Sequence, residues 1–432
     1  MLSIEQIKGL MQGGGYDNAL AELYATKPQD TKLYSERFCK LLDNYKEVFG
    51  DADKTYLFSA PGRTEIGGNH TDHQRGHVLA ASVNLDVIGV AVPNASRIIR
   101  IKSEGYPMDT IELDDLTIHK DEVNKAISLI RGMAARLTEM GYTLGGFDAF
   151  TTSNVLSGSG LSSSAAFEVL VGNMMSTLYC NSAITPVQIA QIGQYAENVY
   201  FGKPSGLMDQ TASSVGGIIT IDFKSTADPV VEKVDYDFTK SGYALCILDS
   251  GADHADLTDE YAAIPRDMKA VANFFGKDYL REVDEADFFA KIHQIRKTAG
   301  DRAVLRAVHF YADDKRVTDQ VKAIRENRFD DFLALVTESG HSSFMYLQNV
   351  FPIGSAQHQE MSVALAVCEK LLAGKGAYRV HGGGFAGTIQ AFVPLEMLKS
   401  FKEGAEAVLG QGNCHVLSIR GVGGCEVCPD TK

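Results

Sequence analysis

The chain has 432 residues, of which 45% are hydrophobic and 22% are charged, as in soluble globular proteins with a well-formed core. This length predicts two or three domains. The net charge of −14 argues against a general nucleic-acid or anionic-membrane surface, because both require clustered lysine and arginine. It does not exclude a phosphate ligand, which backbone amides at a helix N-terminus can hold.

Nothing in the sequence indicates export or a membrane span. The first residues, MLSIEQIKGLMQ, lack the basic start and long apolar run of a signal peptide. The most apolar stretch, Val78–Val92, is too short for a span and contains Asn84 and Asp86. The seven cysteines, an odd number, indicate reduced thiols. We therefore expect a cytoplasmic protein without a membrane partner.

Hydrophobic periodicity predicts a mixed order of helices and strands in the first half. Residues 1–30 are expected to form one or two short helices, broken at Gly13–Gly15. The strands Asp86–Val92 and Arg97–Ile101 are expected to pair across a turn at Pro93-Asn94. The other expected elements are helices at 35–49, 125–140 and 186–200, strands at 147–155 and 217–223, and a helix with an apolar face from Phe167 to Leu178.

A second pattern begins near residue 235. It comprises a strand at 244–250, several helices up to residue 373, a strand at 388–393, a helix at 395–408 and a strand at 416–420. Strands alternate with helices in both halves, which predicts a mixed α/β chain. We expect a helical extension at residues 1–30, a first domain at 31–235 and a second domain at 236–432.

Residues 62–74, GRTEIGGNHTDHQ, place an arginine, a histidine and an aspartate between glycines. Glycine lets the backbone approach a ligand closely, and the polar side chains supply charge and hydrogen bonds to hydroxyl groups. Such a run is costly inside a core, so it is predicted to line a site. The cluster of His70, Asp72, His73 and His77 also permits a transition-metal site, although sugar-hydroxyl binding accounts equally well for His70 and Asp72.

Residues 157–164, SGSGLSSS, lie between a predicted strand and a predicted helix. Glycines there would let the backbone wrap a polyphosphate, and the helix N-terminus would favour its negative charge. Serine hydroxyls can add hydrogen bonds or hold magnesium. A capped helix after a flexible loop explains this segment alone equally well. No P-loop or G-x-S-x-G signature is found in the sequence, and residues 157–164 lack the third glycine of a dinucleotide-binding loop, which argues against those site classes here.

Three carboxylates are candidates for catalysis or metal binding. Asp209, in PSGLMDQ (204–210), could orient or deprotonate a hydroxyl nucleophile, although a turn or helix-cap role fits the isolated residue. Glu197 and Glu168 could bind magnesium, or could be ordinary solvated carboxylates. The pair Cys425 and Cys428 is interpreted as two unrelated thiols. The two glycine-rich segments and the segment 204–210, which contains Asp209, together indicate phosphoryl transfer from a nucleotide to a small sugar.

In this order, the segments resemble the galactokinases, which belong to the GHMP small-molecule kinase family. The resemblance covers the chain from about Tyr45 onward and rests on three motifs. They are APGRTEIGGNHTDHQRGHVL (60–79), LSGSGLSSSAAFE (156–168) and VHGGGFAGTIQAF (380–392). The linking segments AENVYFGKPSGLMDQ (196–210), ADLTDEYAAIPRDM (255–268) and ESGHSSFMYLQNVF (338–351) are similar too.

The resemblance implies a fold, cofactors and roles for particular residues. The implied fold is an N-terminal domain like ribosomal protein S5, with a left-handed crossover, followed by a ferredoxin-like C-terminal domain. The implied cofactors are ATP and Mg²⁺. The implied residues are Arg63 and Asp209 for catalysis; Asn69, His70, Asp72, Gly206 and Tyr261 for the sugar; Gly158, Ser159, Gly160, Leu161, Ser162, Ser163 and Ser164 for ATP; Ser164 and Glu197 for the metal; and Gly382–Gly384 for support from the second domain.

The implied reaction is ATP-dependent phosphorylation of the anomeric hydroxyl of galactose. The first motif departs from the usual family pattern G-R-V-N-L-I-G-E-H-x-D-Y, with Glu65 in place of asparagine and Asn69 in place of the glutamate that binds the C6 hydroxyl. Asparagine does not repel an anion, so galacturonate or N-acetylgalactosamine is an alternative substrate. A sugar- and ATP-binding regulator without turnover is a further alternative, and a kinase of a non-sugar alcohol such as mevalonate or homoserine is a third.

Overall fold

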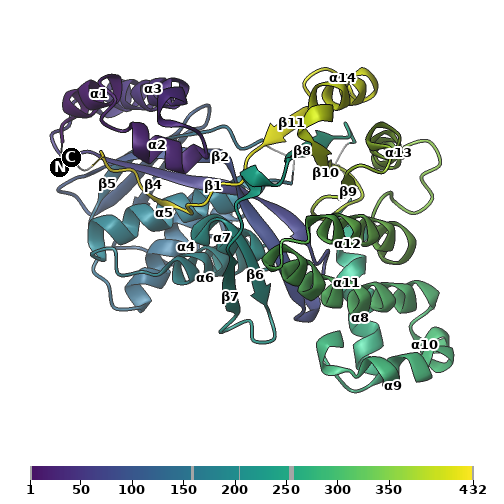
Figure 1. Cartoon of the computed structure of the whole chain (residues 1–432). Helices are drawn as coiled ribbons and strands as arrows, with labels where there is room; N and C mark the ends of the chain where they lie inside the picture. Colours follow the sequence, from purple (N-terminus) through teal and green to yellow (C-terminus); the bar gives the residue numbers. More distant parts are fainter. Residues whose placement is uncertain (1, 157–159, 204, 253–256, 431–432) are drawn as a thin grey trace.

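A computed structural model describes residues 2–156, 160–203, 205–252 and 257–430. Within these residues, the twelve strands form two sheets, one of eight strands and one of four. Figure 1 shows the larger sheet and its helices on the left, formed mainly by the N-terminal half, and the smaller sheet with its helices on the right. The predicted mixed α/β class is confirmed.

The eight-stranded sheet has the strand order β12-β1-β2-β5-β3-β4, with β6 and β7 continuing from one end of β2. Its strands are β1 (Tyr56–Gly67), β2 (His77–Pro93), β3 (Ile98–Ser103), β4 (Met108–Glu112), β5 (Phe147–Ser153), β6 (Ile218–Asp222), β7 (Val230–Val234) and β12 (Cys425–Glu426). Strand β2 is long enough to pair with β5 through residues 87–93 and with β6 through residues 77–81.

The predicted pairing of neighbouring strands across Pro93-Asn94 is wrong. Strand β5 lies between them, antiparallel to β2 and parallel to β3. Asn94 N–H donates to the Gly146 carbonyl at 2.9 Å, so the connection after β2 bonds to the segment that leads into β5. Pairing with a strand about 50 residues away thus prevails over the local hairpin, because β5 is mostly buried and pairs with both β2 and β3.

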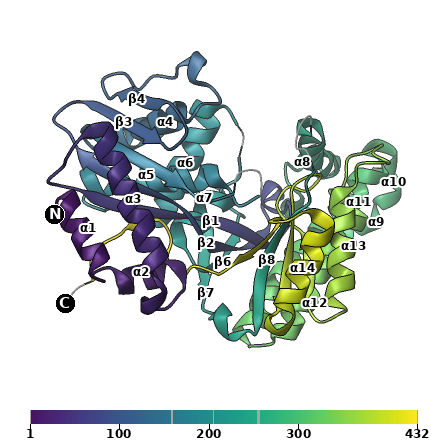
Figure 2. The ribbon, with the colours of Figure 1, turned by 90° about the horizontal axis from the view of Figure 1, so that it is seen from above.

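Helices cover both faces of this sheet (Figure 2). They are α1 (Ile4–Gln12), α2 (Asp17–Tyr24) and α3 (Lys32–Phe49) on one face, and α4 (Ala126–Glu139), α5 (Ser163–Tyr179), α6 (Pro186–Tyr195) and α7 (Met208–Val215) on the other. Successive strand residues point to opposite faces, so Leu57 packs with the N-terminal helices while Phe58 packs in the main core. The predicted short helices in residues 1–30 are confirmed, and they form part of this covering layer.

The C-terminal half contains an antiparallel sheet with the order β11-β8-β10-β9. Its strands are β8 (Tyr243–Asp249), β9 (Ala377–Val380), β10 (Thr388–Pro394) and β11 (Cys414–Leu417), and its helices are α8 (Thr258–Phe274), α9 (Glu285–Ala290), α10 (Ile292–Thr298), α11 (Asp301–Arg325), α12 (Phe329–Ser342), α13 (Glu360–Leu372) and α14 (Leu398–Leu409). The strand predicted at 416–420 thus lies earlier, at Cys414–Leu417.

The end of the chain returns to the N-terminal half. Strand β12 pairs antiparallel with β1, and both termini lie at the same edge of the molecule in Figure 1. Arg420, fully buried, donates to Ser59 at 2.7 Å and to Asp86 at 3.3 Å. The domain limits at residues 30 and 235 stay a prediction. The last ten or so residues of the described chain pack against the N-terminal half, outside the predicted second domain. No helix among the described residues is long and apolar enough to cross a membrane.

Candidate active site

Arg63 and Asp209 meet side by side, although 146 positions separate them in the sequence. Arg63 Nε donates to Asp209 Oδ1 at 2.7 Å, and Arg63 Nη2 donates to Asp209 Oδ2 at 2.7 Å. This two-point contact fixes both side chains, because the planar guanidinium matches the two carboxylate oxygens. Arg63 is only 6% exposed, whereas the Asp209 side chain keeps 32% of its surface exposed.

A bulge in β1 brings Arg63 to the glycine- and serine-rich segment before α5, residues 160–162, where phosphate binding is predicted. The pairing of β1 with β2 shifts register between Pro61 and Arg63. The backbone of Arg63 then donates to the Leu161 carbonyl at 3.0 Å, and its Nη1 donates to the Gly160 carbonyl. A side chain at Gly62 would lie 2.9 Å from the Leu161 oxygen, so this close approach requires glycine.

Ser162 links the loop to the carboxylate. It adopts the left-handed conformation (φ 54°) just before α5, and its hydroxyl donates to Asp209 Oδ2. Burial would raise the pKa of Asp209, but the charge and hydrogen bonds of Arg63, with the bond from Ser162, hold it below its ordinary value. Burial acts against the charge of Arg63 as well, yet Asp209 raises the pKa of that guanidinium. Both groups are therefore charged at neutral pH.

A cavity of about 400 Å³ opens at the start of α5 and reaches the third sequence motif. Its described lining comprises Leu156, Gly160, Ser162, Ser163, Ser164, Lys203, Tyr261, His381, Gly383, Ala386, Gly387 and Thr388. The first turn of α5 has free backbone amides and the positive end of its dipole on this side. The cavity is thus suited to a phosphate chain, and it lies between the two halves of the molecule.

The first and third motifs are bonded together at this cavity. His70 Nε2 lies 2.9 Å from the Gly383 carbonyl, to which it donates, and the Tyr261 hydroxyl donates to the Gly384 carbonyl at 2.8 Å. Burial, followed by the neighbouring His73, lowers the pKa of His70 to about 4. His70 is therefore neutral at pH 7, with Nδ1 as an acceptor. In the described residues, no group of three or more histidine, cysteine or acidic side chains is arranged to hold a metal ion.

Asp72 and Gly206 are in direct contact. A Cβ at Gly206 would lie 2.5 Å from Asp72 Oδ2, so Asp72 takes the space of the missing side chain. The structure therefore brings together Arg63, His70, Asp72, Gly206 and Asp209 near the start of α5, with Tyr261 across the cavity. Their roles remain predictions, and Gly158 and Ser159 of the predicted ATP-binding set lie outside the described residues.

Asn69 occupies a different environment from the one expected of a sugar ligand. It is fully buried. Its Nδ2 donates to Glu65 Oε1 at 2.9 Å and to the Gly382 carbonyl at 2.7 Å. Its Oδ1 accepts from Asn349 at 2.8 Å and Ser343 at 3.2 Å. The side-chain amide of Asn69 is thus hydrogen-bonded to other protein groups. The structure therefore gives no support to a sugar contact by Asn69, or to the galacturonate alternative that was based on such a contact.

Two of the departures from the family motif, at positions 65 and 69, bond to each other. Glu65 and Asn69 exchange the carboxylate and amide of the usual pattern, and they stay within 2.9 Å. The carboxylate at position 65 pairs with Arg379 on β9 at 2.6 Å, and Arg379 also donates to the Ile66 carbonyl at 2.7 Å. Burial raises the pKa of Glu65, although Arg379 opposes the shift. This buried pair connects β1 to the smaller sheet.

Glu197 and Glu168 are bridged by the side-chain amide of Gln210. Gln210 Nε2 donates to Glu197 Oε2 at 2.9 Å and to Glu168 Oε2 at 3.0 Å. Burial, with Glu197 nearby, raises the pKa of Glu168 well above its ordinary value. Glu168 Oε1 is buried without a hydrogen-bond partner among the described residues. Ser164 lines the cavity, whereas Glu197 is buried with its carboxylate bonded to Gln210, so their joint role in holding Mg²⁺ stays a prediction.

Three functional contacts were not foreseen from the sequence. They involve Ser162 as a donor to Asp209, His381 between Thr64 and Thr388, and Lys203 at the cavity wall. Lys203 lies between Glu197 and Asp209 in the sequence, so its position near the site could have been predicted from these two neighbours. The other two depend on the left-handed turn at Ser162 and on contact between the two halves, which periodicity does not reveal.

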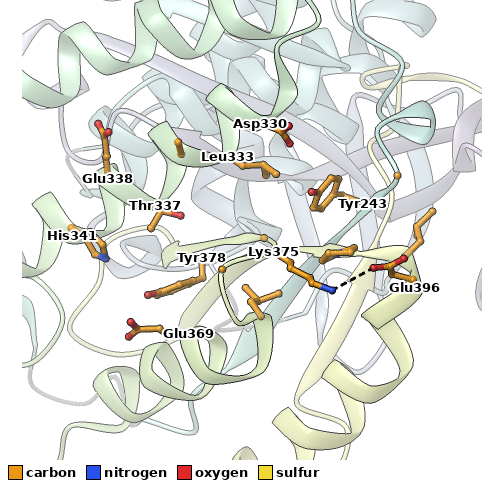
Figure 3. A pocket seen from close by; sticks show the side chains of 17 residues that line it. Tyr243, Asp330, Leu333, Thr337, Glu338, His341, Glu369, Lys375, Tyr378 and Glu396 are labelled. Atoms are coloured by element: carbon orange, nitrogen blue, oxygen red, sulfur yellow. Dashed lines mark ion pairs between the residues drawn. The ribbon is translucent and has the colours of Figure 1, made fainter.

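A larger cavity, of about 1100 Å³, lies away from all these residues (Figure 3). It is formed by α12, the end of α13, β9 and the segments that flank β8 and β10. Its charged lining is mainly acidic: Asp330, Glu338, Glu369 and Glu396, with Lys375 paired to Glu396 at 4.0 Å. An acidic lining repels phosphate, so this cavity is a poor candidate for a nucleotide site.

Comparison with known proteins supports the same family. Residues 128–217 match the GHMP kinases N-terminal domain, and residues 43–93 match the galactokinase galactose-binding signature. A galactokinase of Streptomyces coelicolor is 30% identical over 346 residues, covering 80% of this chain and 86% of that protein. A galactokinase of Glaesserella parasuis is 30% identical over 372 residues, covering 83% of this chain and 90% of that protein.

Solved structures agree with this assignment. Lactococcus lactis galactokinase complexed with galactose superimposes with a TM-score of 0.77 at 25% identity, over 90% of this chain and 99% of that one. Mevalonate kinase of Methanococcus jannaschii shares the fold, with a TM-score of 0.60 at 14% identity, over 85% of this chain and 98% of that one. The chain therefore belongs to the galactokinase family of the GHMP kinases.

Proposed function

We propose that this chain transfers the terminal phosphoryl group of ATP to the anomeric hydroxyl of galactose, giving galactose 1-phosphate and ADP. The observation that carries the proposal is the two-point contact of Arg63 with Asp209 beside the start of α5. The fixed cation and the ionised carboxylate bond to Gly160 and Ser162, which line the cavity at the N-terminus of α5. Family membership supports the reaction, and the galactose complex of the L. lactis relative supports the sugar.

The chemistry follows from the charges of these groups. Asp209 would accept a hydrogen bond from the sugar hydroxyl and point its oxygen at the phosphate. A carboxylate with a lowered pKa is a weak proton acceptor, so orientation and charge contribute more than early proton removal. Arg63 would stabilise the negative charge that develops on the transferring group. The amides of α5 would hold the remaining phosphates.

The sugar would lie between the first motif and the glycines of the third. Neutral His70 offers Nδ1 as an acceptor, Asp72 offers a carboxylate, and Tyr261 closes the cavity opposite the loop. Ser164 and Glu197 would hold Mg²⁺, which supplies positive charge to the phosphates when bound. The seven cysteines are free thiols, which supports a cytoplasmic location for the reaction.

A coupled ADP-release assay with a panel of sugars tests the proposal. We expect the highest kcat/KM with galactose, ahead of galacturonate and N-acetylgalactosamine, and no turnover with mevalonate or homoserine. Asp209→Asn should reduce kcat by about 100-fold or more, from the usual contribution of acid–base groups. ATP affinity, measured by calorimetry, should change little, because the variant preserves the shape of the site.

Asp237→Asn is the matched control, since Asp237 is an exposed carboxylate that caps a turn away from the cavity. Near-normal turnover in Asp209→Asn would remove Asp209 from its role. A wild-type protein that binds ATP and galactose but releases no ADP would instead be a regulator. A strong preference for galacturonate would overturn the assignment of galactose.

A further inference from the structure

The cavity at the phosphate loop has one lysine or arginine in its described lining, Lys203. Ser162, Ser163 and Ser164 line the same cavity. Arg63, the other cation nearby, is committed to Asp209 through two hydrogen bonds and to the Gly160 carbonyl through a third. Lys203 is therefore the cation best able to change partner when an anion enters.

The backbone places Lys203 by a sharp reversal. A π-helical turn, Ala196–Phe201, ends at Gly202, which adopts the left-handed conformation with φ 88°. The amides of Gly202 and Lys203 both donate to the Glu197 carbonyl, at 2.9 and 3.1 Å. Glycine suits this conformation, which turns the next side chain back toward the helix it follows. The Lys203 ammonium then lies 3.7 Å from Glu197 Oε1, with 58% of its side chain exposed.

Charge balance gives this lysine a function beyond one ion pair. The carboxylates of Glu168, Glu197 and Asp209 all lie close enough to one another or to Lys203 to interact electrostatically. Asp209 is neutralised by Arg63 through two hydrogen bonds, whereas the carboxylate of Glu197 faces the Lys203 ammonium. Glu197 would therefore repel an incoming polyphosphate if Lys203 were absent.

We propose that Lys203 binds the terminal phosphate of the nucleotide, moving its ammonium from Glu197 to a phosphate oxygen. This inference rests on the proposed function. An ammonium on a four-carbon stem can make this change, because it is a mobile point charge without a fixed fork geometry. The terminal phosphate is the partner because Lys203 shares the cavity with Ser162, whose hydroxyl donates to Asp209, the residue that would hold the accepting hydroxyl.

Binding measurements separate this role from a structural one. Calorimetry would give the Kd of ATP and of ADP for wild type, Lys203→Met and Lys203→Arg, in Mg²⁺ and in EDTA. We expect Lys203→Met to weaken ATP binding about tenfold, the value of one charge-assisted hydrogen bond, and ADP binding by clearly less. Lys203→Arg should restore most of the affinity. The loss should persist in EDTA, because the contact is to phosphate.

Lys240→Met is the matched control, since Lys240 pairs with Asp237 at 3.1 Å and is not among the residues that line the cavity. Unchanged ATP affinity in Lys203→Met would overturn the inference. A loss seen only in Mg²⁺ would also overturn it, because Lys203 would then act through Glu197 alone. Thermal melting checks that each variant is folded, with Lys203→Gln as a second neutral variant. Absence of sugar phosphorylation by wild type would refute the proposed function and leave these binding data to decide the inference.

Discussion

Gly206 shows how a residue without a side chain can shape a binding site. It precedes α7 and packs against Asp72 from the first motif, so the two segments approach each other more closely than any other residue would allow. The φ angle of Gly206 is not positive, so its backbone is outside the left-handed region. The requirement for glycine here is therefore one of space and not of backbone conformation.

Gly206→Ala should weaken sugar binding selectively. The added Cβ would lie 2.5 Å from Asp72 Oδ2, so the carboxylate must turn away from its present position. Loss of one charged hydrogen bond predicts a rise of about tenfold in the KM for galactose, with the Kd of ATP nearly unchanged. Steady-state kinetics with both substrates varied would measure this. Gly421→Ala is the control, because a Cβ there meets no atom within 4 Å. An unchanged KM for galactose would show that Asp72 is not a sugar ligand.

At this scale, motif order indicated which residues gather at the site, but not what each one contacts. The partnership of Arg63 with Asp209 was expected, and these two residues lie together. Asn69 was expected in the pocket, yet its amide is saturated by protein groups. The reason is the exchange of amide and carboxylate between positions 65 and 69, whose meaning depends on Arg379, a partner about 310 positions away that no local pattern identifies.

Among the elements, α2 depends on a residue from the far end of the chain. Its N-cap, Tyr16, makes no side-chain hydrogen bond. Instead, Asp430 accepts from the amides of Asn18 and Ala19 at 3.0 and 2.9 Å. A carboxylate at this position satisfies two free amides and interacts favourably with the helix dipole. The C-terminal tail therefore acts as the N-terminal cap of α2.

Asp430→Ala should destabilise the N-terminal helical layer. Removing a cap of this kind costs about 1 kcal/mol of the free energy of unfolding. Hydrogen exchange should show faster opening of α1 and α2, and chemical denaturation should give a lower midpoint. Asp430→Asn should lose less, because an amide oxygen still accepts one bond. Equal protection of α2 in wild type and Asp430→Ala would show that the tail does not cap this helix.

Helices and single strands could be predicted from the sequence because periodicity and terminal glycines are local signals. Helix α3 ends at Phe49 before Gly50, and α4 ends close to Gly141, as expected. Pairing could not be predicted the same way. The polypeptide between β2 and β3 is short, which favours a hairpin, but the mostly buried strand β5 pairs with both of them instead. Strand order is set by contacts between segments distant in sequence.

At the scale of the whole molecule, buried polar side chains connect the two halves around the site through hydrogen bonds. His309 on α11 is a central member of this set and is fully buried. Its Nε2 donates to the Asn69 carbonyl at 2.9 Å, and its Nδ1 accepts from the Ser342 hydroxyl at 2.9 Å. The same network continues through Asp313, whose carboxylate accepts from the backbone N–H of Asn69 at 2.9 Å. The first motif is thereby held by α11 and α12 of the other half.

This network makes stability sensitive to acid. Burial lowers the pKa of His309 below its ordinary value of 6.5, although Asp313 opposes the shift. Below that value the unfolded chain takes up a proton on this imidazole and the folded chain does not, so acid favours unfolding. Burial raises the pKa of Glu65 and of Glu168, so the folded chain holds these two protons more tightly than the unfolded chain. For these groups a rise in pH therefore favours unfolding. The total pH dependence mixes both signs, so a difference between variants is the informative quantity.

We expect His309→Gln to be less stable than wild type at pH 7.5, because the amide replaces the two ring hydrogen bonds imperfectly. The gap should narrow as the pH falls from about 6.5 toward 5, since only wild type then loses the stability tied to a neutral His309. Urea denaturation at pH 7.5, 6.5 and 5 would measure the difference in unfolding free energy. His358→Gln serves as the control, at an imidazole that is 82% exposed. A gap that stays constant or widens in acid would mean that His309 does not link protonation to the fastening of the two halves.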